Sequence, residues 1–322
     1  MRRKGSFGGL KGMLAAGALA MAFLSLCPAA VAEDAYLFAY FKEPGNQGIY
    51  LALSRDGYHY TALNDGQPWV KPEKAGEIMR DVFLARGPDG KFHMVWTWNW
   101  KGQSLGYADS PDLMHWSAQK EVAIMAGVPA TRNVWAPEID WDAKRSKWLI
   151  IWSSSMNGSS EGNRIWSSLT ADFDTFTKPA VFFDPGYVVI DATMFKRAEK
   201  GKDRYYFIFK DQTLDPLRYQ IRYATGPTVE GPWSRIQAPL TEPWSEGPSA
   251  IRVGKEFVIY YDHYRAPHAQ YEGVQSTDWI HWESINDRIS FPEHCKHGSF
   301  LRITQEEADR LLARHDAPAA AE

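Results

Sequence analysis

Two stretches of the sequence, Ser110-Pro111-Asp112-Leu113-Met114-His115-Trp116 and Ser276-Thr277-Asp278-Trp279-Ile280-His281-Trp282, share a serine, an aspartate two positions later and a closing tryptophan. Related aromatic-ended segments recur along the chain. Five closing rings are separated by steps of 56, 60, 57 and 49 residues: Tyr60, Trp116, Phe176, Trp233 and Trp282. Alternating apolar runs and short turns lie between them. This period predicts an all-β fold, a five-bladed β-propeller with four strands in each blade.

The middle strand of each predicted blade is an aromatic and β-branched run. These runs cover 36–41, 92–98, 147–153, 205–210 and 257–264. Four of them follow an innermost strand that begins with or near a carboxylate. A fifth candidate for an innermost strand starts at His297, near the C-terminus. The C-terminal strand is therefore expected to join the N-terminal strands and close the ring, which removes an open sheet edge. The propeller is expected to span residues 33–304.

Both ends of the chain are expected to lie outside the propeller. Arg2, Arg3 and Lys4 precede an apolar stretch from Leu10 to Leu26, and Ala30-Val31-Ala32 follows as a cleavage site. Residues 1–32 therefore read as a Sec-type signal peptide, and the protein as exported to the periplasm or beyond. Leu26 is too large for a lipoprotein signal before Cys27, and a single Arg pair gives little support to twin-arginine export. Residues 305–322 predict a short amphipathic helix and a flexible tail.

Charge and cysteine content exclude several classes of protein. The chain has 36 Lys and Arg against 39 Asp and Glu, a net charge of −3, so it lacks the basic surface of a nucleic-acid binder. No segment after the signal peptide reaches about 18 apolar residues, so no membrane span is expected. Loss of the signal peptide leaves Cys295 without a disulfide partner, and we interpret it as a packing residue. The protein is expected to act as a monomer.

The starts of the innermost strands carry the functional prediction. In a propeller these strands line the central channel, so equivalent positions lie at one level around the axis. Four acids and one histidine are expected to converge there: Asp81, Glu138, Asp191, Glu246 and His297. Inverting glycosidases hold two carboxyl groups about 6.5–9.5 Å apart, against about 5–5.5 Å in retaining enzymes. A pair from non-neighbouring blades suits inversion, and this geometry fits either Asp81 or Glu138 opposite Glu246.

The succession of motifs Arg80-Asp81, Trp135-Ala136-Pro137-Glu138, Ile190-Asp191-Ala192-Thr193, Glu246-Gly247-Pro248 and His297-Gly298-Ser299 resembles glycoside hydrolase family 43. The resemblance implies inverting hydrolysis of arabinosides, xylosides and related sugars. It implies Asp81 as general base, Glu246 as general acid and Asp191 as the carboxylate that orients the acid and tunes its proton affinity. His297 matches a histidine that lies near a water or a calcium ion in many members, and no other cofactor is implied. Val82 and Ala192 replace the usual prolines, which bears on subfamily and substrate.

Further residues are candidates for substrate contact. Trp98, Trp100, Trp135 and Trp244 lie beside the predicted axial ends, where each would stack on sugar or fill the core. Arg80 and Arg132 would pair with carboxylates or touch substrate. Glu138 would accept a substrate hydroxyl or hold the Trp135 loop.

The resulting prediction is a secreted, exo-acting hydrolase that removes terminal arabinofuranosyl, galactofuranosyl or xylosyl residues from plant or microbial polysaccharide. Two alternatives stay open at this point. One is a carbohydrate-binding propeller without turnover. The other is a sialidase-like glycosidase, suggested by the Ser54-Arg55-Asp56-Gly57 turn although no arginine cluster repeats at the strand starts. His294 and His297 lack a matching second pair of ligands for a catalytic metal.

Overall fold

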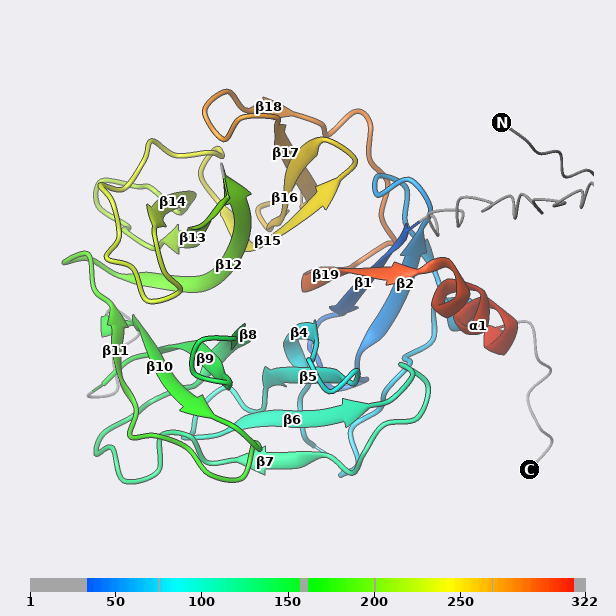
Figure 1. The fold of residues 1–322 in the computed structure, drawn as a ribbon, viewed down its shortest axis with the longest axis horizontal. Coiled ribbons are helices and arrows are strands. Elements are labelled where there is room, and N and C mark those ends of the chain that lie inside the picture. The colour runs from blue at the N-terminus through cyan, green and yellow to red at the C-terminus, as the bar shows by residue number, and fades with distance from the viewer. Residues whose placement is uncertain (1–33, 75, 157–161, 200, 268, 316–322) are drawn as a thin grey trace, which may run out of the picture. The chain divides into compact units, whose positions relative to one another are not determined.

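The computed structural model describes residues 34–74, 76–156, 162–199, 201–267 and 269–315. The predicted signal peptide and the end of the C-terminal tail lie outside these residues. Five antiparallel sheets form a ring with one strand of each nearest its middle (Figure 1). The predicted five-bladed β-propeller is confirmed. No helix in this described part of the chain is long and apolar enough to cross a membrane.

The blades follow the sequence repeat, and in each the strands are given from the innermost outward. The first blade contains β19 (Lys296–Thr304), β1 (Asp34–Phe41), β2 (Tyr50–Ser54) and β3 (Thr61–Ala62), followed by the 3₁₀ turn η1 (Asn64–Gly66). The second contains β4 (Arg80–Arg86), β5 (Phe92–Thr97), β6 (Leu105–Ser110) and β7 (Lys120–Val122). The third contains β8 (Trp135–Asp142), β9 (Lys147–Ser154), β10 (Arg164–Thr170) and β11 (Ala180–Phe183).

The fourth blade differs from the expected four strands. It has three strands, β12 (Val189–Glu199), β13 (Lys202–Asp211) and β14 (Gln220–Gly226). The fifth blade has the expected four, β15 (Ser245–Val253), β16 (Glu256–His263), β17 (Gln270–Ser276) and β18 (Glu283–Ser284). Ser234, Gln237 and Leu240 still donate backbone hydrogen bonds to β14. The intervening spacing is irregular and includes Pro239, which has no N–H to donate, so this outer segment follows β14 without forming a regular strand.

The C-terminal strand closes the ring, as the sequence predicts. β19 pairs antiparallel with β1, with Tyr36 opposite Arg302 and Phe38 opposite Phe300. The Phe38 and Phe300 rings stack at 4.5 Å between centroids, so the two ends of the chain share one aromatic core. The five innermost strands then neighbour one another in the order β4, β8, β12, β15, β19 and back to β4. Asp81 and Glu246 therefore belong to non-neighbouring blades.

The repeated serine and aspartate form a turn at the outer part of a blade. Ser110 Oγ accepts the Leu113 N–H at 2.8 Å, and Asp112 Oδ1 accepts the Met114 and His115 N–H groups at 2.9 Å each. Asp112 Oδ2 also lies 2.7 Å from His115 Nδ1. The same serine or threonine and aspartate bonds recur in the turns that begin at Ser54, Thr170 and Ser276. The repeat that identifies the fold is thus a side-chain-stabilised turn.

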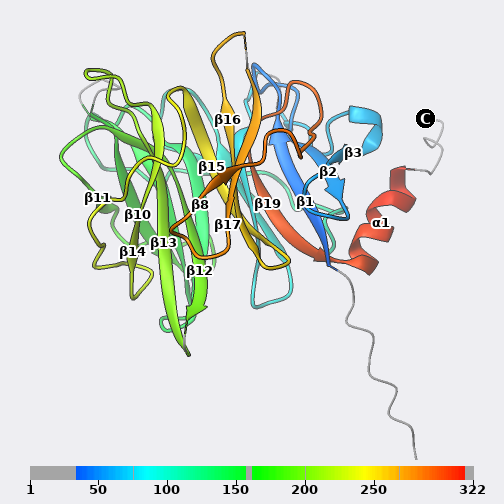
Figure 2. The same ribbon diagram turned by 90° about the horizontal axis from the view of Figure 1, so that it is seen from above.

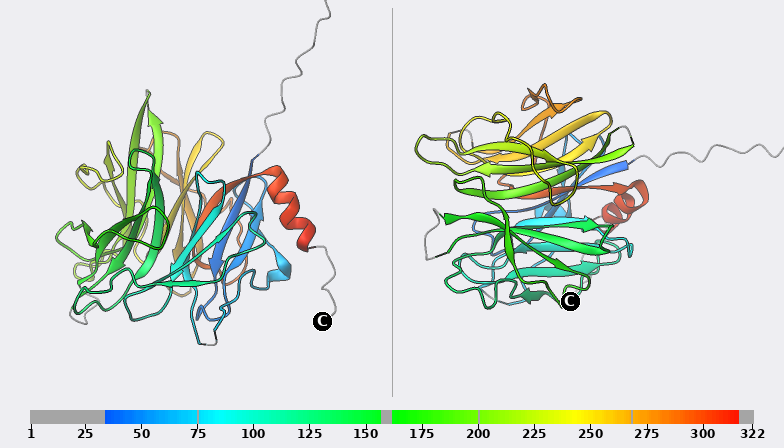
Figure 3. Two further views of the ribbon diagram at one scale, coloured as in Figure 1. Left: turned by 60° about the horizontal axis from the view of Figure 1, so that its bottom comes forward. Right: turned by 60° about the vertical axis from the view of Figure 1, so that its left-hand side comes forward.

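Helix α1 (Gln305–His315) lies on the outer side of the first blade, beside β1 and β2 (Figures 2 and 3). Its start is a capping box: Thr304 Oγ1 accepts the Glu307 N–H, and Glu307 Oε2 accepts the Thr304 N–H. Ala308 and Leu311 are fully buried in the core shared by the first two blades. Glu307 also pairs with Arg86 at 2.6 Å, which ties the helix to the second blade.

Candidate active site

Every innermost strand is bulged where it enters the channel. Two residues of the inner strand oppose one residue of the next strand, after the pairs Arg80↔Thr97, Trp135↔Ser153, Ile190↔Lys210, Glu246↔Asp262 and Lys296↔Phe41. The first extra residue is Asp81, Ala136, Asp191, Gly247 or His297. Four of these have positive φ, between 46° and 57°. A bulge redirects side chains and raises the local twist, so this feature aims Asp81, Asp191 and His297 into the entrance.

The second bulge residue is the position at which Val82 and Ala192 replace the prolines of the family that the sequence resembles. These replacements leave Asp81 and Asp191 in place. That position holds Val82, Pro137, Ala192, Pro248 or Gly298. The pairing on either side of the bulge is the same with valine or alanine as with proline. Gly247 is required at its own position, because a Cβ there would lie 2.4 Å from His297 Cγ.

The register corrects the expectation that all five candidate groups lie at one level. Asp81, Asp191 and His297 do share a bulge position. Glu246 comes one residue earlier, level with Arg80 and Lys296, because Gly247 occupies the bulge position of its strand. Glu138 comes two residues later than the bulge position of its own strand and lies deeper in the channel. The site therefore has two carboxylates and a histidine at one level and a third carboxylate nearer the entrance.

His297 lies between two carboxylates. Its Nδ1 is 3.4 Å from Asp81 Oδ1 and 3.9 Å from Asp191 Oδ2. Burial works to lower the pKa of His297, but the two aspartates outweigh it and raise the pKa to about 9. Burial works in turn to raise the pKa of Asp81, and the hydrogen bond and charge of His297 lower it below its ordinary value. Asp81 is therefore ionised beside an imidazolium at neutral pH.

Backbone and hydroxyl groups hold the two aspartates. Thr97 Oγ1 donates to Asp81 Oδ2 at 2.7 Å and accepts the Ala136 N–H at 2.8 Å, which links the second and third blades. The Gly247 N–H donates to Asp191 Oδ2 at 3.2 Å, which links the fourth blade to the fifth. Burial is the largest cause that raises the pKa of Asp191, to about 6, and the charge of Glu246 adds to it.

Lys210 is a member of the site that the sequence interpretation missed. It ends the apolar run of β13, and its side chain is only 1% exposed. Its Nζ donates to Glu246 Oε2 at 2.8 Å and to Tyr264 Oη at 3.1 Å. Burial works to lower the pKa of Lys210, and the charges of Glu246 and Asp191 raise it above its ordinary value. A charged residue directly after the apolar run Tyr205–Phe209 was the available signal, since a lysine is buried only when it is paired.

Glu138 lies deeper in the channel than the other candidate groups. Its side chain is buried, and Oε2 has no hydrogen-bond partner within the described residues. Burial raises its pKa well above the ordinary value. Glu138 is therefore a neutral acid below the entrance, and its contact with a substrate hydroxyl or with the Trp135 loop stays a prediction.

The tryptophans divide into core and rim. Trp98 is 5% exposed and belongs to the core shared by the first two blades, so its interpretation as a sugar platform is not supported. Trp100 is 51% exposed, and Trp135 Nε1 donates to its carbonyl oxygen at 3.0 Å. The Trp244 ring meets the edges of Tyr219 and Tyr264. Trp100, Trp135 and Trp244 thus surround the entrance.

Arg80 is held by the rim. Its guanidinium lies between the rings of Phe41 and Trp100, 4.3 and 4.1 Å from their centroids. Its Nη1 lies 2.5 Å from Glu43 Oε2. The partner of Arg80 is therefore this half-exposed glutamate and not one of the axial carboxylates.

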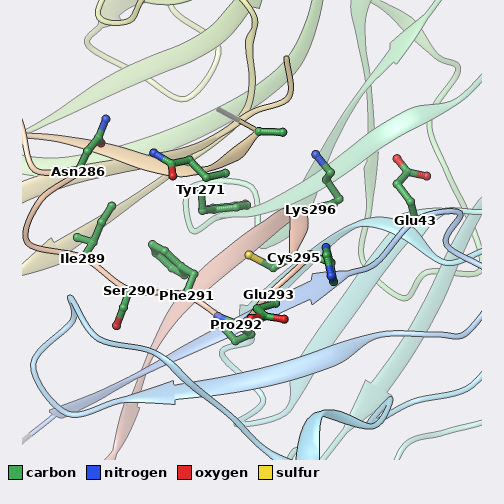
Figure 4. A pocket seen from close by; sticks show the side chains of 13 residues that line it. Glu43, Tyr271, Asn286, Ile289, Ser290, Phe291, Pro292, Glu293, Cys295 and Lys296 are labelled. Atoms are coloured by element: carbon green, nitrogen blue, oxygen red, sulfur yellow. The ribbon is translucent and has the colours of Figure 1, made fainter. Parts of the chain in front are cut away.

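Two cavities adjoin the entrance from different sides. One, of about 400 Å³, lies between the third and fourth blades and includes Trp135 and Ile190 in its wall. The other, of about 650 Å³, lies between the fifth and first blades, where Figure 4 shows Glu43 and Lys296 at one side and Asn286, Ile289 and Phe291 at the other. Cys295 faces this second cavity but is buried, and burial is the main cause that raises its thiol pKa to about 12. Such a thiol is not a nucleophile at neutral pH.

The donors around His297 do not make a calcium cage. Calcium takes about six to eight oxygen ligands at about 2.3–2.6 Å. The nearest carboxylates, Asp81 and Asp191, face the imidazole, and no group of three metal-ligating side chains gathers in the described ranges. A calcium ion at this position stays a prediction, and no step of the reaction is derived through it.

Comparison with known proteins gives a family and a fold. Residues 32–309 match the glycosyl hydrolase 43-related family, described as a "probable glycosyl hydrolase domain". An α-L-arabinofuranosidase of Bifidobacterium longum is 24% identical over 276 residues, which cover 70% of this chain and 25% of that protein. The chain thus spans about a quarter of this curated relative.

Solved structures with the same fold include an endo-1,4-β-xylanase of Bacteroides thetaiotaomicron and an exo-β-1,3-galactanase of Clostridium thermocellum. The xylanase superposes with a TM-score of 0.55 at 13% identity, over 80% of this chain and 93% of that one. The galactanase superposes with a TM-score of 0.51 at 15% identity, over 64% of this chain and 47% of that one.

Proposed function

Because the chain belongs to the glycosyl hydrolase 43-related family, and so to the glycosidases, we propose that it removes terminal arabinofuranosyl residues from polysaccharide with inversion of the anomeric carbon. Galactofuranosyl and xylosyl residues are the other candidates. The similarity to an α-L-arabinofuranosidase supports the choice of arabinofuranose. The observation that carries the proposal is the set of ionisable groups at the entrance, with Asp81 beside an imidazolium and Glu246 beside an ammonium.

Asp81 is the proposed general base. A base must be ionised before the reaction, and the contact with His297 together with the Thr97 hydrogen bond favours its carboxylate form. It would take a proton from a water molecule as that water attacks the anomeric carbon. Since Asp81 and Glu246 come from non-neighbouring blades, a sugar and a water molecule fit between them more readily than between adjacent groups.

Glu246 is the proposed general acid, which protonates the leaving glycosidic oxygen. Three carboxylates, Asp81, Asp191 and Glu246, face two cations, His297 and Lys210. Asp81 lies closest to the imidazolium and keeps its charge, whereas burial raises the pKa of Asp191 to about 6. Lys210 fixes the orientation of Glu246 through the contact between Nζ and Oε2.

A screen of nitrophenyl glycosides tests the proposal, with the α-L-arabinofuranoside, β-D-galactofuranoside and β-D-xyloside as the first substrates. We expect turnover of the arabinofuranoside, and an exo-acting enzyme should release only monosaccharide from a longer arabinan oligosaccharide. Turnover of the galactofuranoside or xyloside alone would change the sugar. Failure of every glycoside in the presence of a folded protein would contradict the proposed activity.

Export completes the proposal. Arg2, Arg3, Lys4 and the apolar stretch that follows support a signal peptide, and these residues lie outside the described ones. Expression of the full chain in a bacterium should yield a periplasmic or secreted protein that begins at Glu33. Recovery of a protein that still begins at Met1 from the cytoplasm would contradict this part of the proposal.

A further inference from the structure

The ammonium of Lys210 has a second partner besides the proposed general acid. Its Nζ donates to Glu246 Oε2 at 2.8 Å and to Tyr264 Oη at 3.1 Å. Burial is the largest cause that raises the pKa of Tyr264, to about 12, so the phenol is neutral near pH 7 and its oxygen accepts this bond. Of the three N–H groups of the ammonium, one is thus directed to the carboxyl group and one to the phenol.

Two tyrosine rings enclose the same ammonium. The ring centroids of Tyr264 and Tyr219 lie 4.6 and 5.1 Å from Lys210 Nζ, within the range of a cation–π contact. Both rings meet the Trp244 indole edge to face, at 6.0 and 5.2 Å between centroids. The two tyrosines therefore have similar ring contacts. They differ in the hydroxyl group, since in the described part of the chain only the Tyr264 hydroxyl accepts a hydrogen bond from Lys210.

The backbone holds Tyr264 next to the strand end that carries Glu246. Tyr264 directly follows β16, and its N–H donates to the Trp244 carbonyl oxygen at 3.2 Å. Trp244 lies two residues before Glu246, and the residue between them, Ser245, pairs with His263. The phenol and the acid therefore belong to one blade, the fifth, whereas Lys210 reaches both from the fourth.

A second carboxylate lies near the ammonium on the fourth blade itself. Ile190 pairs with Lys210 across β12 and β13, and Asp191 is the next residue of β12. Burial works to lower the pKa of Lys210, and the charges of Glu246 and then Asp191 raise it. Among the described residues, however, no hydrogen bond or ion pair joins Lys210 to Asp191. The ammonium is thus directed to the acid of the fifth blade although a carboxylate of its own blade attracts it.

We propose that Tyr264 is a positioning residue, which directs the Lys210 ammonium to Glu246 rather than to Asp191. The inference rests on the proposed function, in which Glu246 is the general acid, and adds a residue that acts on this acid through Lys210. The N–H groups of an ammonium lie at fixed angles to one another, so a bond from one of them to Tyr264 Oη helps to fix the direction of the N–H that holds Glu246. Without this hydroxyl the ammonium can turn toward Asp191, and Glu246 loses its fixed orientation for proton transfer.

Tyr264→Phe removes the hydroxyl and keeps the ring, so it tests this hydrogen bond alone. We expect kcat/KM for α-1,5-linked arabinobiose, whose leaving group needs a proton, to fall by about 3- to 10-fold, the usual worth of one hydrogen bond. For the dinitrophenyl α-L-arabinofuranoside, whose leaving group needs little protonation, kcat/KM should stay within about 2-fold of wild type. A general structural loss would lower both rates alike, so the ratio of the two rates reports on the acid. If the screen selects another sugar, its own disaccharide and dinitrophenyl glycoside are used.

Tyr219→Phe is the matched control, because the Tyr219 ring also contacts Lys210 and Trp244. The ratio of the two rates should keep its wild-type value in this variant. Glu246→Gln is the reference for a defect in the acid itself, and it should show the same preference for the dinitrophenyl substrate to a larger extent. Tyr264→Met serves as a second variant if Tyr264→Phe does not fold, and it should show the same selective loss.

A double-mutant cycle separates action through Lys210 from direct contact between Tyr264 and the sugar. In the Lys210→Met background, Tyr264→Phe should change kcat/KM for arabinobiose by less than about 2-fold, because the group that the hydroxyl positions is absent. The same loss in both backgrounds would overturn the proposal and would indicate that the tyrosine acts on the substrate itself.

The outcomes separate the positioning role from the proposed function. Equal loss on both substrates in Tyr264→Phe, or no loss on arabinobiose, would overturn the positioning role and leave the proposed function standing. A wild-type protein that hydrolyses neither the dinitrophenyl glycoside nor the disaccharide of any of the three sugars would overturn both. A thermal unfolding midpoint measured for each variant shows that the fold is unchanged.

Discussion

The ammonium of Lys210 lies 2.8 Å from Glu246 Oε2, and the two side chains are exposed to very different degrees, 1% for the lysine and 30% for the glutamate. The lysine is therefore committed to this pair, since a buried ammonium without a partner is costly. The carboxylate is free to face the entrance. One residue thus supplies a fixed cation and the other an accessible acid, which is the arrangement that an oriented proton donor requires.

Lys210→Met should lower kcat by at least about 10-fold, because Glu246 loses the group that orients it. Removal of the positive charge should also move the alkaline limb of the pH profile of kcat/KM to higher pH, since a neutral carboxyl group is then favoured. The limb is measured in wild type and variant, with thermal unfolding as the check on the fold. A uniform loss at every pH would mean that Lys210 has only a structural role.

Asp81→Asn and Glu246→Gln should each reduce turnover by about 10²- to 10⁴-fold, the usual contribution of one positioned acid or base. The Glu246 variant should be partly rescued on a dinitrophenyl glycoside, whose leaving group needs little protonation. Asp203→Asn, at an exposed aspartate near the β12–β13 turn, is the control and should keep full activity. Near-wild-type rates in either site variant would refute the assignment of that residue.

The first sugar released should have the inverted anomeric configuration, because Asp81 and Glu246 come from non-neighbouring blades. Proton NMR of the reaction, recorded before the product mutarotates, gives the configuration directly. A retained anomer would indicate a reacting pair on neighbouring blades, with Asp191 and Glu246 as the first candidates.

Asp191→Asn should move the alkaline limb of kcat/KM to lower pH and leave the acidic limb, set by Asp81, almost unchanged. The reason is electrostatic: removal of the Asp191 charge leaves Lys210 unopposed next to Glu246, so the acid loses its proton more easily. Both limbs are measured in wild type and variant. If Asp191 only binds a sugar hydroxyl, activity should fall to the same extent at every pH.

His297 should make the stability of the protein fall as the pH becomes alkaline. Its pKa rises from about 6.5 in the unfolded chain to about 9 in the fold, through the charges of Asp191 and Asp81 against the effect of burial. Its contribution to the free energy of unfolding is therefore complete below about pH 6.5 and is lost as pH rises through about 9. The difference in unfolding midpoint between wild type and His297→Gln should shrink between pH 6 and pH 10. A constant difference would show that His297 stabilises the site only by packing.

The sequence by itself determined the number of blades, the closure of the ring by residues 297–302 and the strand ends at which the acids gather. These features depend on local patterns, namely alternating apolar residues and a serine and aspartate turn, which recur five times at the period of a four-stranded propeller blade. Family membership also followed from short motifs, because each motif is a bulged strand end with its own requirements, such as glycine at position 247 against the His297 ring.

Only the tertiary structure decided the levels of the acids and the partners that they meet. Glu246 and Glu138 stand one residue before and two residues after the bulge positions of their strands, and an inspection of acids along the chain cannot detect such an offset. Lys210 reaches Glu246 from another blade, and Trp98 lies in the core rather than at the rim. The physical reason is that register and side-chain direction arise from pairing between strands, so a residue's protonation state and access to substrate depend on neighbours that are distant in sequence.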